Sequence, residues 1–423
     1  MNILLLNQDW FAQELRTFGH SVLTCGVGSH LDFRLAHPVV HIDDLIALLP
    51  GTFKPDVLVW LDDSAPITFM GLENSDIPTM MYSVDTHHHW ELHARLAHCF
   101  DHVLVAQKDY LHHFAPSATP ATWLPLWASR HVEPSPVKTM PMAFVGTMDP
   151  KLNKKRVEFF TALKEVAPIT IKQGNYWEIF PMAELVINQT VSGDLNFRVF
   201  EAMMCGSMLL TERSPNGLLE LFTEGEHLVT YTAGDVNDAA LKASALLENP
   251  SRLQAIAQAG RERVLSSHTA LHRAAVLHDI LSSIQKRPKT PARHFPMMIN
   301  LAIASSLLGT RNPALGVLAL QGAIQCALAS LKDGCLPSNT ESAHLIRTYL
   351  RWDQMCGNDM GSKLLVRHAE AFPSDYLLAL ARIRSLLNQG SRLEAEVVAS
   401  SISPEPPAQI FSIAEQTVSL ILQ

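Results

Sequence analysis

The stretch that decides the fold class, Asp194–Glu212, reads Asp-Leu-Asn-Phe-Arg-Val-Phe-Glu-Ala-Met-Met-Cys-Gly-Ser-Met-Leu-Leu-Thr-Glu. The apolar run Leu185–Asn188 before it predicts a strand, and Asp194 is expected to cap a helix. Gly206 is a good helix stop, and Ser207–Thr211 predicts the next buried strand. Four apolar residues recur at helical spacing and predict one buried stripe: Leu195, Val199, Ala202 and Met203. Strand, loop, helix and strand form the core of a parallel α/β domain.

Polar groups gather where this helix is expected to begin. Asn196 and Arg198 lie at its start, and Glu201 lies one turn later. Free backbone N–H groups at a helix N-terminus can hold an anion. Arg198 would add a forked, permanently charged donor for a phosphate. The carboxylate of Glu201 could accept two hydrogen bonds from a sugar diol.

The same stretch resembles the signature of GT-B glycosyltransferases, specifically of the CgeB-like (spore maturation protein B-like) group. That group has a Ser/Asp-Leu-Asn-x-Arg-x-Phe-Glu-Ala-x-x-Cys-Gly run in its C-terminal Rossmann-like domain. In related GT-B enzymes two glutamates separated by seven residues lie here, and the second binds the nucleotide ribose. Glu201 matches the second glutamate, whereas the first falls on Gly193, and Asp194 is one place late. CgeB-like members generally depart in this way. The alternative is an ordinary amphipathic helix in a non-catalytic Rossmann-like domain.

The bulk composition indicates a globular chain of two or three domains. It has 423 residues, of which 47% are hydrophobic and 17% charged. A net charge of −8 without a basic block argues against nucleic acid as the main partner. Six cysteines without CxxC pairing, and an N-terminus without a basic region, favour the cytoplasm. The apolar stretch Ala314–Leu331 contains two glutamines and favours a buried helix over a membrane span.

Residues 1–138 alternate strand and helix, which predicts a Rossmann-like domain with a parallel sheet. Its expected strands are Ile3–Leu6, Ser21–Thr24, Val57–Leu61, Thr79–Ser83, Val103–Ala106 and Leu124–Leu126. Ligands of such sheets bind at the carboxyl ends of the strands. The polar residues just past those ends are Asn7, Gln8, Asp9, Asp62, Asp63 and Asp85–His88. Among them, the resemblance implies a sugar-facing role for Asp85 or His87, and His87 could accept a proton near neutral pH.

Residues 139–285 are expected to form a second Rossmann-like domain. The run FVGTMDPKLNKKRVEFFTAL, from Phe144 to Leu163, resembles the start of the C-terminal domain in the same family. Gly146 would let the backbone approach a ligand closely. Four cations at the next helix entrance suit either a phosphate or a solvated basic edge: Lys151, Lys154, Lys155 and Arg156. Thr211 and Arg213, at a later strand end, are candidates for donor contact.

Residues 286–296 are basic and proline-containing and are interpreted as a linker. Residues 296–423 are expected to be all helix. Two glycine-containing breaks lie 33 residues apart, which resembles tetratricopeptide-like repeats. The residues that carry this similarity are Gly357, Ala369, Pro373, Leu377, Ala379, Gly390 and Ala395. A non-repeating helical bundle is the alternative. A concave repeat face could hold a protein or peptide acceptor.

The resemblance implies an α/β fold of two Rossmann-like domains (GT-B), followed by an all-α domain. It implies transfer of a sugar from a nucleotide-diphosphate sugar to an acceptor, without metal or cofactor. The expected donor-binding residues are Gly146, Thr147, Asn196, Arg198, Glu201 and Thr211, and the expected catalytic residues are Asp85 and His87. Two alternatives stay open: a nucleotide-sugar epimerase of GT-B architecture, or a non-catalytic scaffold that binds partners through its helices. A metal pair at His89 and His93 is the weaker interpretation of the histidine-rich stretch.

Overall fold

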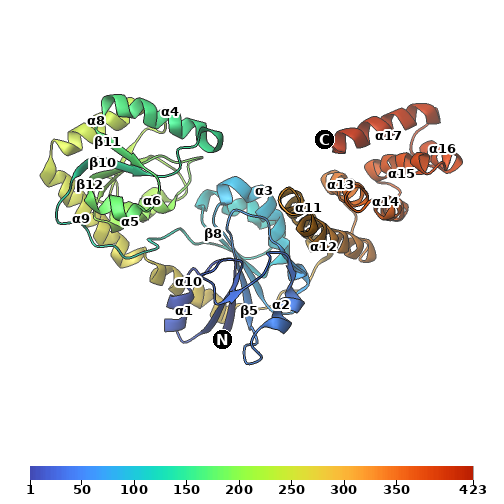
Figure 1. Cartoon of the computed structure of the whole chain (residues 1–423), viewed down its shortest axis with the longest axis horizontal. Helices are drawn as coiled ribbons and strands as arrows, with labels where there is room; N and C mark the ends of the chain where they lie inside the picture. The colour runs from blue at the N-terminus through green and yellow to red at the C-terminus, as the bar shows by residue number, and fades with distance from the viewer. Residues whose placement is uncertain (423) are drawn as a thin grey trace.

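The computed structural model describes residues 1–422 and contains two α/β domains followed by a stack of helices (Figure 1). The first domain has a seven-stranded sheet in the order β3-β2-β1-β5-β7-β8-β9, and its pairs are parallel. The strands are β1 Asn2–Leu6, β2 Ser21–Gly26, β3 Phe33–Arg34, β5 Val57–Leu61, β7 Thr79–Ser83, β8 His102–Val105 and β9 Ala121–Trp123. A separate parallel pair joins β4 (Val40–His41) to β6 (Phe69–Met70).

Both faces of the first sheet are covered, because side chains alternate between two cores along each strand. Leu4 and Leu6 of β1 point into one core, and Ile3 and Leu5 into the other. Helices α2 (Ile42–Leu48) and α3 (Thr86–Leu96) contribute to the first core. Helices α1 (Ala12–Thr17) and α10 (Ala270–Ser283) contribute to the second. This double burial explains why the central strands are apolar runs.

The second domain has a five-stranded parallel sheet in the order β11-β10-β12-β13-β14. Its strands are β10 Met140–Val145, β11 Ile169–Lys172, β12 Ala183–Asn188, β13 Met208–Glu212 and β14 Val229–Tyr231. Helices α4 (Pro150–Val166) and α8 (Val236–Leu247) cover one face, and α6 (Phe197–Met204) covers the other. The strand order reverses between β10 and β12. In open α/β sheets this reversal opens a crevice for ligands.

The second domain is tied back to the first by its last two helices. The chain runs through α9 (Pro250–Ser267) and α10, which crosses back and packs on α1 (Figure 1). A ring nitrogen of His20, Nε2, lies 2.8 Å from Nδ1 of His278 on α10. Helix α10 therefore fixes the end of the second domain to the first.

The segment Leu185–Glu212 folds as strand, loop, helix and strand, but the expected helix cap at Asp194 is wrong. Helix α6 begins at Phe197, and Asn196 is its N-cap residue. Asp194 does not cap the helix, because its carboxylate accepts a hydrogen bond from the Val191 N–H group at 2.7 Å and closes the preceding loop. The apolar stripe is buried as expected, with Leu195 just before the helix. Strand β11 was not foreseen, because its residues are only half-buried at the sheet edge.

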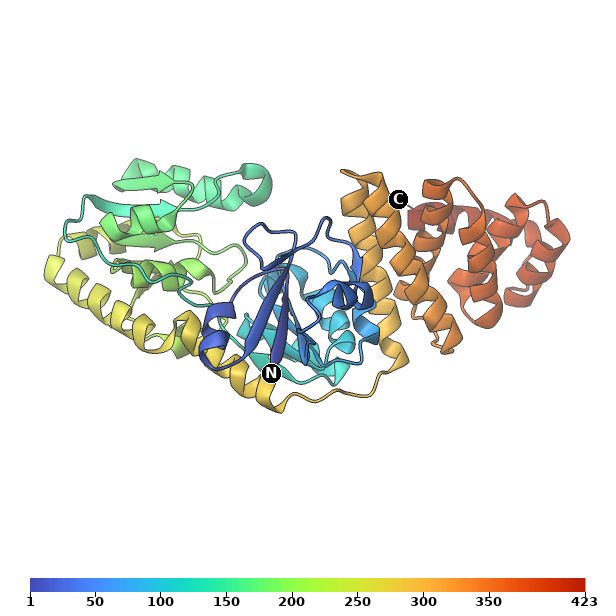
Figure 2. The same ribbon diagram turned by 60° about the horizontal axis from the view of Figure 1, so that its bottom comes forward.

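The C-terminal residues form antiparallel helices that stack outward from the first domain (Figure 2). They are α11 His294–Gly309, α12 Pro313–Lys332, α13 Asn339–Cys356, α14 Met360–Ala371, α15 Tyr376–Asn388, α16 Arg392–Ile402 and α17 Pro407–Leu422. Within residues 1–422, α12 alone is long and apolar enough to cross a membrane. It packs between α11 and α13, and half of its apolar window is buried, as in the core helix of a globular domain. The tetratricopeptide-like repeat stays a prediction.

Residues 286–296 connect α10 to α11, and they are bonded to the first domain along the way. Asp101 of the first domain accepts hydrogen bonds from Lys286 Nζ at 2.9 Å and from the Arg287 N–H group at 2.7 Å. Farther on, the Asn300 amide donates to the Ile67 carbonyl at 2.8 Å and accepts from its N–H group at 3.0 Å. One continuous core joins the first sheet to α11, α12 and α13. The first helices of the tail are therefore part of the first domain's packing.

Candidate functional site

Gly146 lies at the end of β10, at the crevice where the second sheet reverses its order. A Cβ atom added to Gly146 would lie 2.7 Å from Cζ of Phe144 and 2.8 Å from Nη2 of Arg198. Both distances are too short for a side chain, so the guanidinium can lie against the backbone here only because the residue is glycine. Thr147, the next residue, is exposed.

Arg198, in the first turn of α6, points toward β10 and β12. Its Nε donates to the Val145 carbonyl at 3.0 Å and its Nη1 to Asn188 Oδ1 at 2.6 Å. The guanidinium carbon lies 4.5 Å from the centre of the Phe144 ring. Burial lowers the pKa of Arg198 to about 10, so the group is still charged at neutral pH. The position is fixed by two bonds, and Nη2 lies beside Gly146.

Thr211 supports Arg198 through a neighbour. It is fully buried, and its hydroxyl accepts a hydrogen bond from Asn188 Nδ2 at 3.0 Å. Asn188 in turn holds the guanidinium of Arg198. Direct contact between Thr211 and a donor stays a prediction, and the visible role of Thr211 is to orient Asn188. Arg213 is exposed and forms an ion pair with Glu224 at 2.6 Å.

Arg156 is the cation of the α4 entrance that turns inward. The three lysines there are exposed, whereas Arg156 is buried, with Nε donating to Gln189 Oε1 at 3.0 Å. Burial lowers the pKa of Arg156, and the proximity of Arg156 adds to the lowering by burial at Arg198. The Asp194 carboxylate opposes both shifts. Two guanidiniums and one carboxylate therefore meet at this edge. The helical spacing of Arg156 with the buried Phe159, Phe160 and Leu163 was the available signal for its inward direction.

Asn196 leaves polar groups without partners at the start of α6. Its backbone occupies the N-cap position, but its side chain makes no capping hydrogen bond. The amide oxygen and nitrogen are both buried and have no partner among residues 1–422. Because buried polar atoms are nearly always satisfied, this amide is suited to a bound molecule.

Glu201 lies one turn after Asn196 and is half-buried. Burial raises the pKa of Glu201 to about 7, and the nearby Arg198 opposes this rise. Burial raises the pKa of Tyr176, the first residue of α5 (Tyr176–Ile179), and the nearby Glu201 carboxylate adds to this rise. The Tyr176 hydroxyl lies 3.2 Å from the Ser129 hydroxyl. Glu201 therefore lies at the β10–β11 side of the crevice with a titration point near neutrality.

The first domain presents Asp85 and His87 to this region. Asp85 precedes α3, where its N–H group donates to Asp62 at 3.0 Å and its carboxylate accepts from Ser64. Nδ1 of His87 is buried without a partner in the described chain. Burial lowers the pKa of His87, and the Asp194 carboxylate of the second domain is the first of the charges that raise it. The structure thus brings His87 together with the loop that leads into α6.

The metal interpretation of the histidine-rich stretch gains no support. His93 is buried, and its Nδ1 lies 2.8 Å from the Ser83 hydroxyl. In the part of the chain that the structure describes, no group of three His, Cys, Asp or Glu side chains could hold a metal ion.

Contacts between the two domains were missed by the sequence reasoning. Gln107, after β8, accepts a hydrogen bond from the Leu195 N–H group at 2.8 Å and donates to its carbonyl at 3.3 Å. Asn216 accepts a hydrogen bond from the Asp109 N–H group at 3.1 Å and donates one to the Gly193 carbonyl at 2.9 Å. These contacts fix the loop before α6 against the first domain. Single polar residues without a motif give no advance signal of such pairing.

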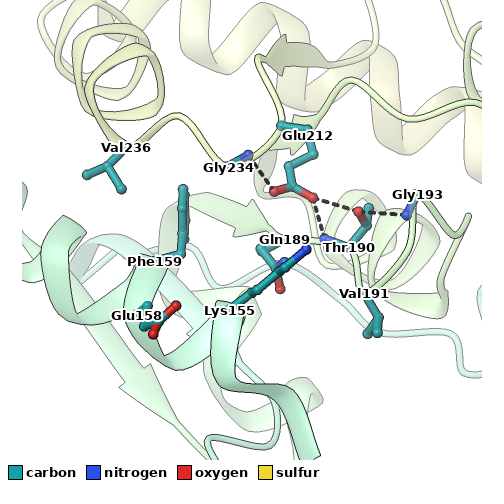
Figure 3. Close-up of a pocket in the computed structure, with 11 residues that line it drawn as sticks. Lys155, Glu158, Phe159, Gln189, Thr190, Val191, Gly193, Glu212, Gly234 and Val236 are labelled. Carbon is teal, nitrogen blue, oxygen red and sulfur yellow. Dashed lines mark hydrogen bonds between the residues drawn. The ribbon is translucent and has the colours of Figure 1, made fainter. Parts of the chain in front are cut away.

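A second opening, of about 530 Å³, lies at the carboxyl ends of β12 and β13 on the α4 and α8 face (Figure 3). Glu212 lies in its wall and accepts hydrogen bonds from the Thr190 N–H group at 2.8 Å and the Gly234 N–H group at 3.0 Å. Lys155 and Gln189 extend along the opposite side (Figure 3). Asn153 Nδ2 of α4 also lacks a partner in the described chain, but the unpartnered Asn196 amide and the Arg198 guanidinium lie together at the start of α6. We therefore place the candidate donor site around Gly146, Asn196, Arg198 and Glu201.

Comparison with known proteins agrees with this architecture. Residues 155–279 match a family model described as "Glycosyl transferase-like". No curated protein sequence matches the chain. The structure of Anabaena HepE in complex with UDP-glucose is similar, with 13% identity and a TM-score of 0.50, over 67% of this chain and 100% of that chain. The structure of HepE in complex with UDP is similar with 12% identity and a TM-score of 0.50, over the same shares of the two chains. Sucrose-phosphate synthase from Thermosynechococcus elongatus is similar with 13% identity and a TM-score of 0.49, over 67% of this chain and 98% of that chain.

At such low identity the similarity to HepE is one of fold. The CgeB-like group, the acceptor and the identities of the site residues stay predictions. The chain has the two parallel-sheet α/β domains of the GT-B glycosyltransferase fold and a helical C-terminal region, and its second domain carries a glycosyl transferase-like sequence.

Proposed function

We propose that this chain is a glycosyltransferase that takes a sugar from a nucleotide-diphosphate sugar. The observation that carries the proposal is the crevice of the second sheet. There Arg198 is held against Gly146, and the buried Asn196 amide has no partner. A helix N-terminus with a fixed guanidinium beside it suits a diphosphate. HepE, which has the same fold, was solved with UDP-glucose.

In this proposal the donor diphosphate lies over the start of α6. The N–H group of Thr147, the Asn196 amide and Nη2 of Arg198 donate to it. Glu201 accepts hydrogen bonds from the ribose hydroxyls. As the bond from the anomeric carbon to the diphosphate breaks, its electron pair moves to the phosphate oxygen. Arg198 and the helix N-terminus stabilise that charge without a metal ion, because they are already oriented.

His87 is proposed as the group that receives the acceptor's proton. Burial keeps this ring largely neutral, and its buried Nδ1 has no partner in residues 1–422. The acceptor oxygen forms a bond to the anomeric carbon as its proton passes to His87. Asp85 and Asp194 stabilise the resulting imidazolium. The six cysteines are all free, which supports the further proposal that the enzyme works in a reducing cytoplasm.

The test is a thermal-shift panel of uridine, guanosine, adenosine and cytidine diphosphates and their sugars, with and without EDTA. A ligand at 100 times its dissociation constant stabilises the folded protein by about 2.7 kcal/mol. Sugar release from the stabilising donor is then followed for wild type and Glu201→Gln. Glu165→Gln, an exposed glutamate on α4, is the matched control. If no nucleotide stabilises the wild type and no donor is hydrolysed or transferred, the proposal is refuted.

A further inference from the structure

A cavity of about 380 Å³ lies between the first domain and α11, away from the donor crevice. One wall is the carboxyl edge of the first sheet, with Asn7 after β1 and Asp63 and Ala65 after β5. The other wall is the last part of α11, with Leu307 and Leu308. The cavity exists only because the helical tail packs on the first domain, so it is not a feature of two α/β domains alone.

Apolar side chains stand at the opening of this cavity from both walls. Val27, just past β2, is 50% exposed, and Leu307 of α11 is 56% exposed. Large apolar side chains that line one cavity and stay exposed mark a surface that gains from being covered. The cavity also carries Asp63 and Arg311, one charge of each sign, and both residues are exposed.

The loop that lines the cavity also reaches the proposed acceptor side of the active site. Asp63 lines the cavity, and the next residue, Ser64, donates to the Asp85 carboxylate. Asn7 and Ser64 have φ values of 79° and 62°, in the left-handed region that residues other than glycine rarely occupy. Such strain persists where the surrounding structure fixes it, often at ligand sites. An acceptor seated in the cavity can therefore extend along this loop toward Asp85 and His87.

We propose that this cavity is an acceptor subsite that takes one apolar side chain of a peptide whose serine or threonine hydroxyl receives the sugar. The proposal rests on the proposed glycosyltransferase function. The charged groups of Asp63 and Arg311 and the amide of Asn7 in the walls suit a peptide. Its backbone offers N–H and carbonyl groups beside an apolar side chain. A polyisoprenoid carrier would need a longer and purely apolar groove. Helix α11 would thus select the acceptor, while the second domain binds the donor.

The test uses synthetic glycine-rich peptides with a single serine and one Phe, Leu or Gly at each of the four nearest positions. With the donor identified by the thermal-shift panel, we expect Phe or Leu at one position to raise kcat/KM by about tenfold or more over Gly, as burial of such a side chain would give. In Leu307→Glu and Val27→Glu, the ratio of kcat/KM for the Phe or Leu peptide to that for the Gly peptide should fall to about one. Leu393→Glu, at an 80% exposed leucine of α16, is the control and should keep the preference. Two variants on opposite walls guard against misfolding of either one.

A binding experiment without donor separates this inference from the proposed function. Millimolar N-acetyl-phenylalanine amide should give ligand-observed NMR contacts with wild type and Leu393→Glu, and these should be lost in Leu307→Glu and Val27→Glu. Equal contacts in all four proteins, or none with wild type, would overturn the cavity assignment even if sugar transfer is found. Transfer to a long-chain alcohol and to no peptide would overturn the peptide class. Absence of any donor turnover would refute only the proposed function.

Discussion

Replacing Glu201 with glutamine should stabilise the protein at alkaline pH while it weakens nucleotide binding. The pKa of Glu201 is raised from 4.5 to about 7 by burial. An acid with a higher pKa in the folded protein than in the unfolded chain loses stability as pH rises from about 4.5 to about 7. At about 1.36 kcal/mol for each pH unit, the upper limit of this loss is about 3 kcal/mol. Because Glu201 is only half-buried, we expect about 1–2 kcal/mol.

The assay compares the thermal midpoints of Glu201→Gln and wild type at pH 5 and pH 8. For a domain the size of the second one, each kcal/mol corresponds to about 2–4 °C. The advantage of glutamine should therefore grow by about 2–8 °C between pH 5 and pH 8. Glu165→Gln, on the surface of α4, should show no such growth.

Nucleotide affinity should move in the opposite direction. Glutamine offers one acceptor oxygen where the carboxylate offers two, so binding at pH 8 should weaken by about 1–3 kcal/mol. Calorimetry with the nucleotide chosen by the thermal-shift panel measures this. A midpoint difference that is equal at both pH values would refute the burial argument. Unchanged affinity in the folded variant would refute the ribose assignment.

Three further changes test other parts of the structure. Gly146→Ala should displace Arg198 or Phe144, because the new Cβ would lie within 2.8 Å of each; thermal unfolding should show a loss of about 1–3 kcal/mol and diphosphate binding should fall. Arg198→Lys keeps the charge but loses the fork, so calorimetry should show a larger loss for the nucleoside diphosphate than for the bare nucleoside; equal losses would exclude a phosphate contact. Asn300→Ala should cost about 1–3 kcal/mol for each Ile67 group left unpaired, measured by urea unfolding; no loss would show that α11 is not needed by the first domain.

The sequence predicted the two sheets well, because the central strands are buried on both faces and read as short apolar runs between turn residues. Val57–Leu61 and Thr79–Ser83 have the bounds that were expected. The half-exposed strand Ile169–Lys172 lacked that pattern and was missed. The start of α6 was misplaced because Asp194 satisfies a loop N–H group instead of a helical one. The preference of aspartate for helix N-caps cannot show whether its carboxylate accepts from a loop N–H group or from a helical one.

The candidate site was harder to foresee than the sheets. The sequence brought Asn196, Arg198 and Glu201 to the first two turns of one helix, which required only helical spacing. It gave no sign that Asn188 and Thr211 orient the guanidinium, because that chain of contacts joins two strands and a helix. The contacts of the helical tail with the first domain were not foreseen for a similar reason. The apolar face of α11 could pack within its own helices or on the first domain, and contacts such as those of Asn300 with Ile67 and of Lys286 with Asp101 show which arrangement forms.

The core shared between the first sheet and α11 to α13 has a consequence for synthesis on the ribosome. The strands of the first domain are complete once Trp123 has emerged, but Ala327 of α12, which packs on the same core, follows roughly 200 residues later. At about 5–20 residues per second, the part of this apolar face that α2 and α3 leave open waits for about 10–40 seconds before it is covered. During that interval the nascent chain exposes an apolar surface that chaperones, or other nascent chains on the same messenger RNA, can bind. The domain that is made first is therefore among the last to be completed.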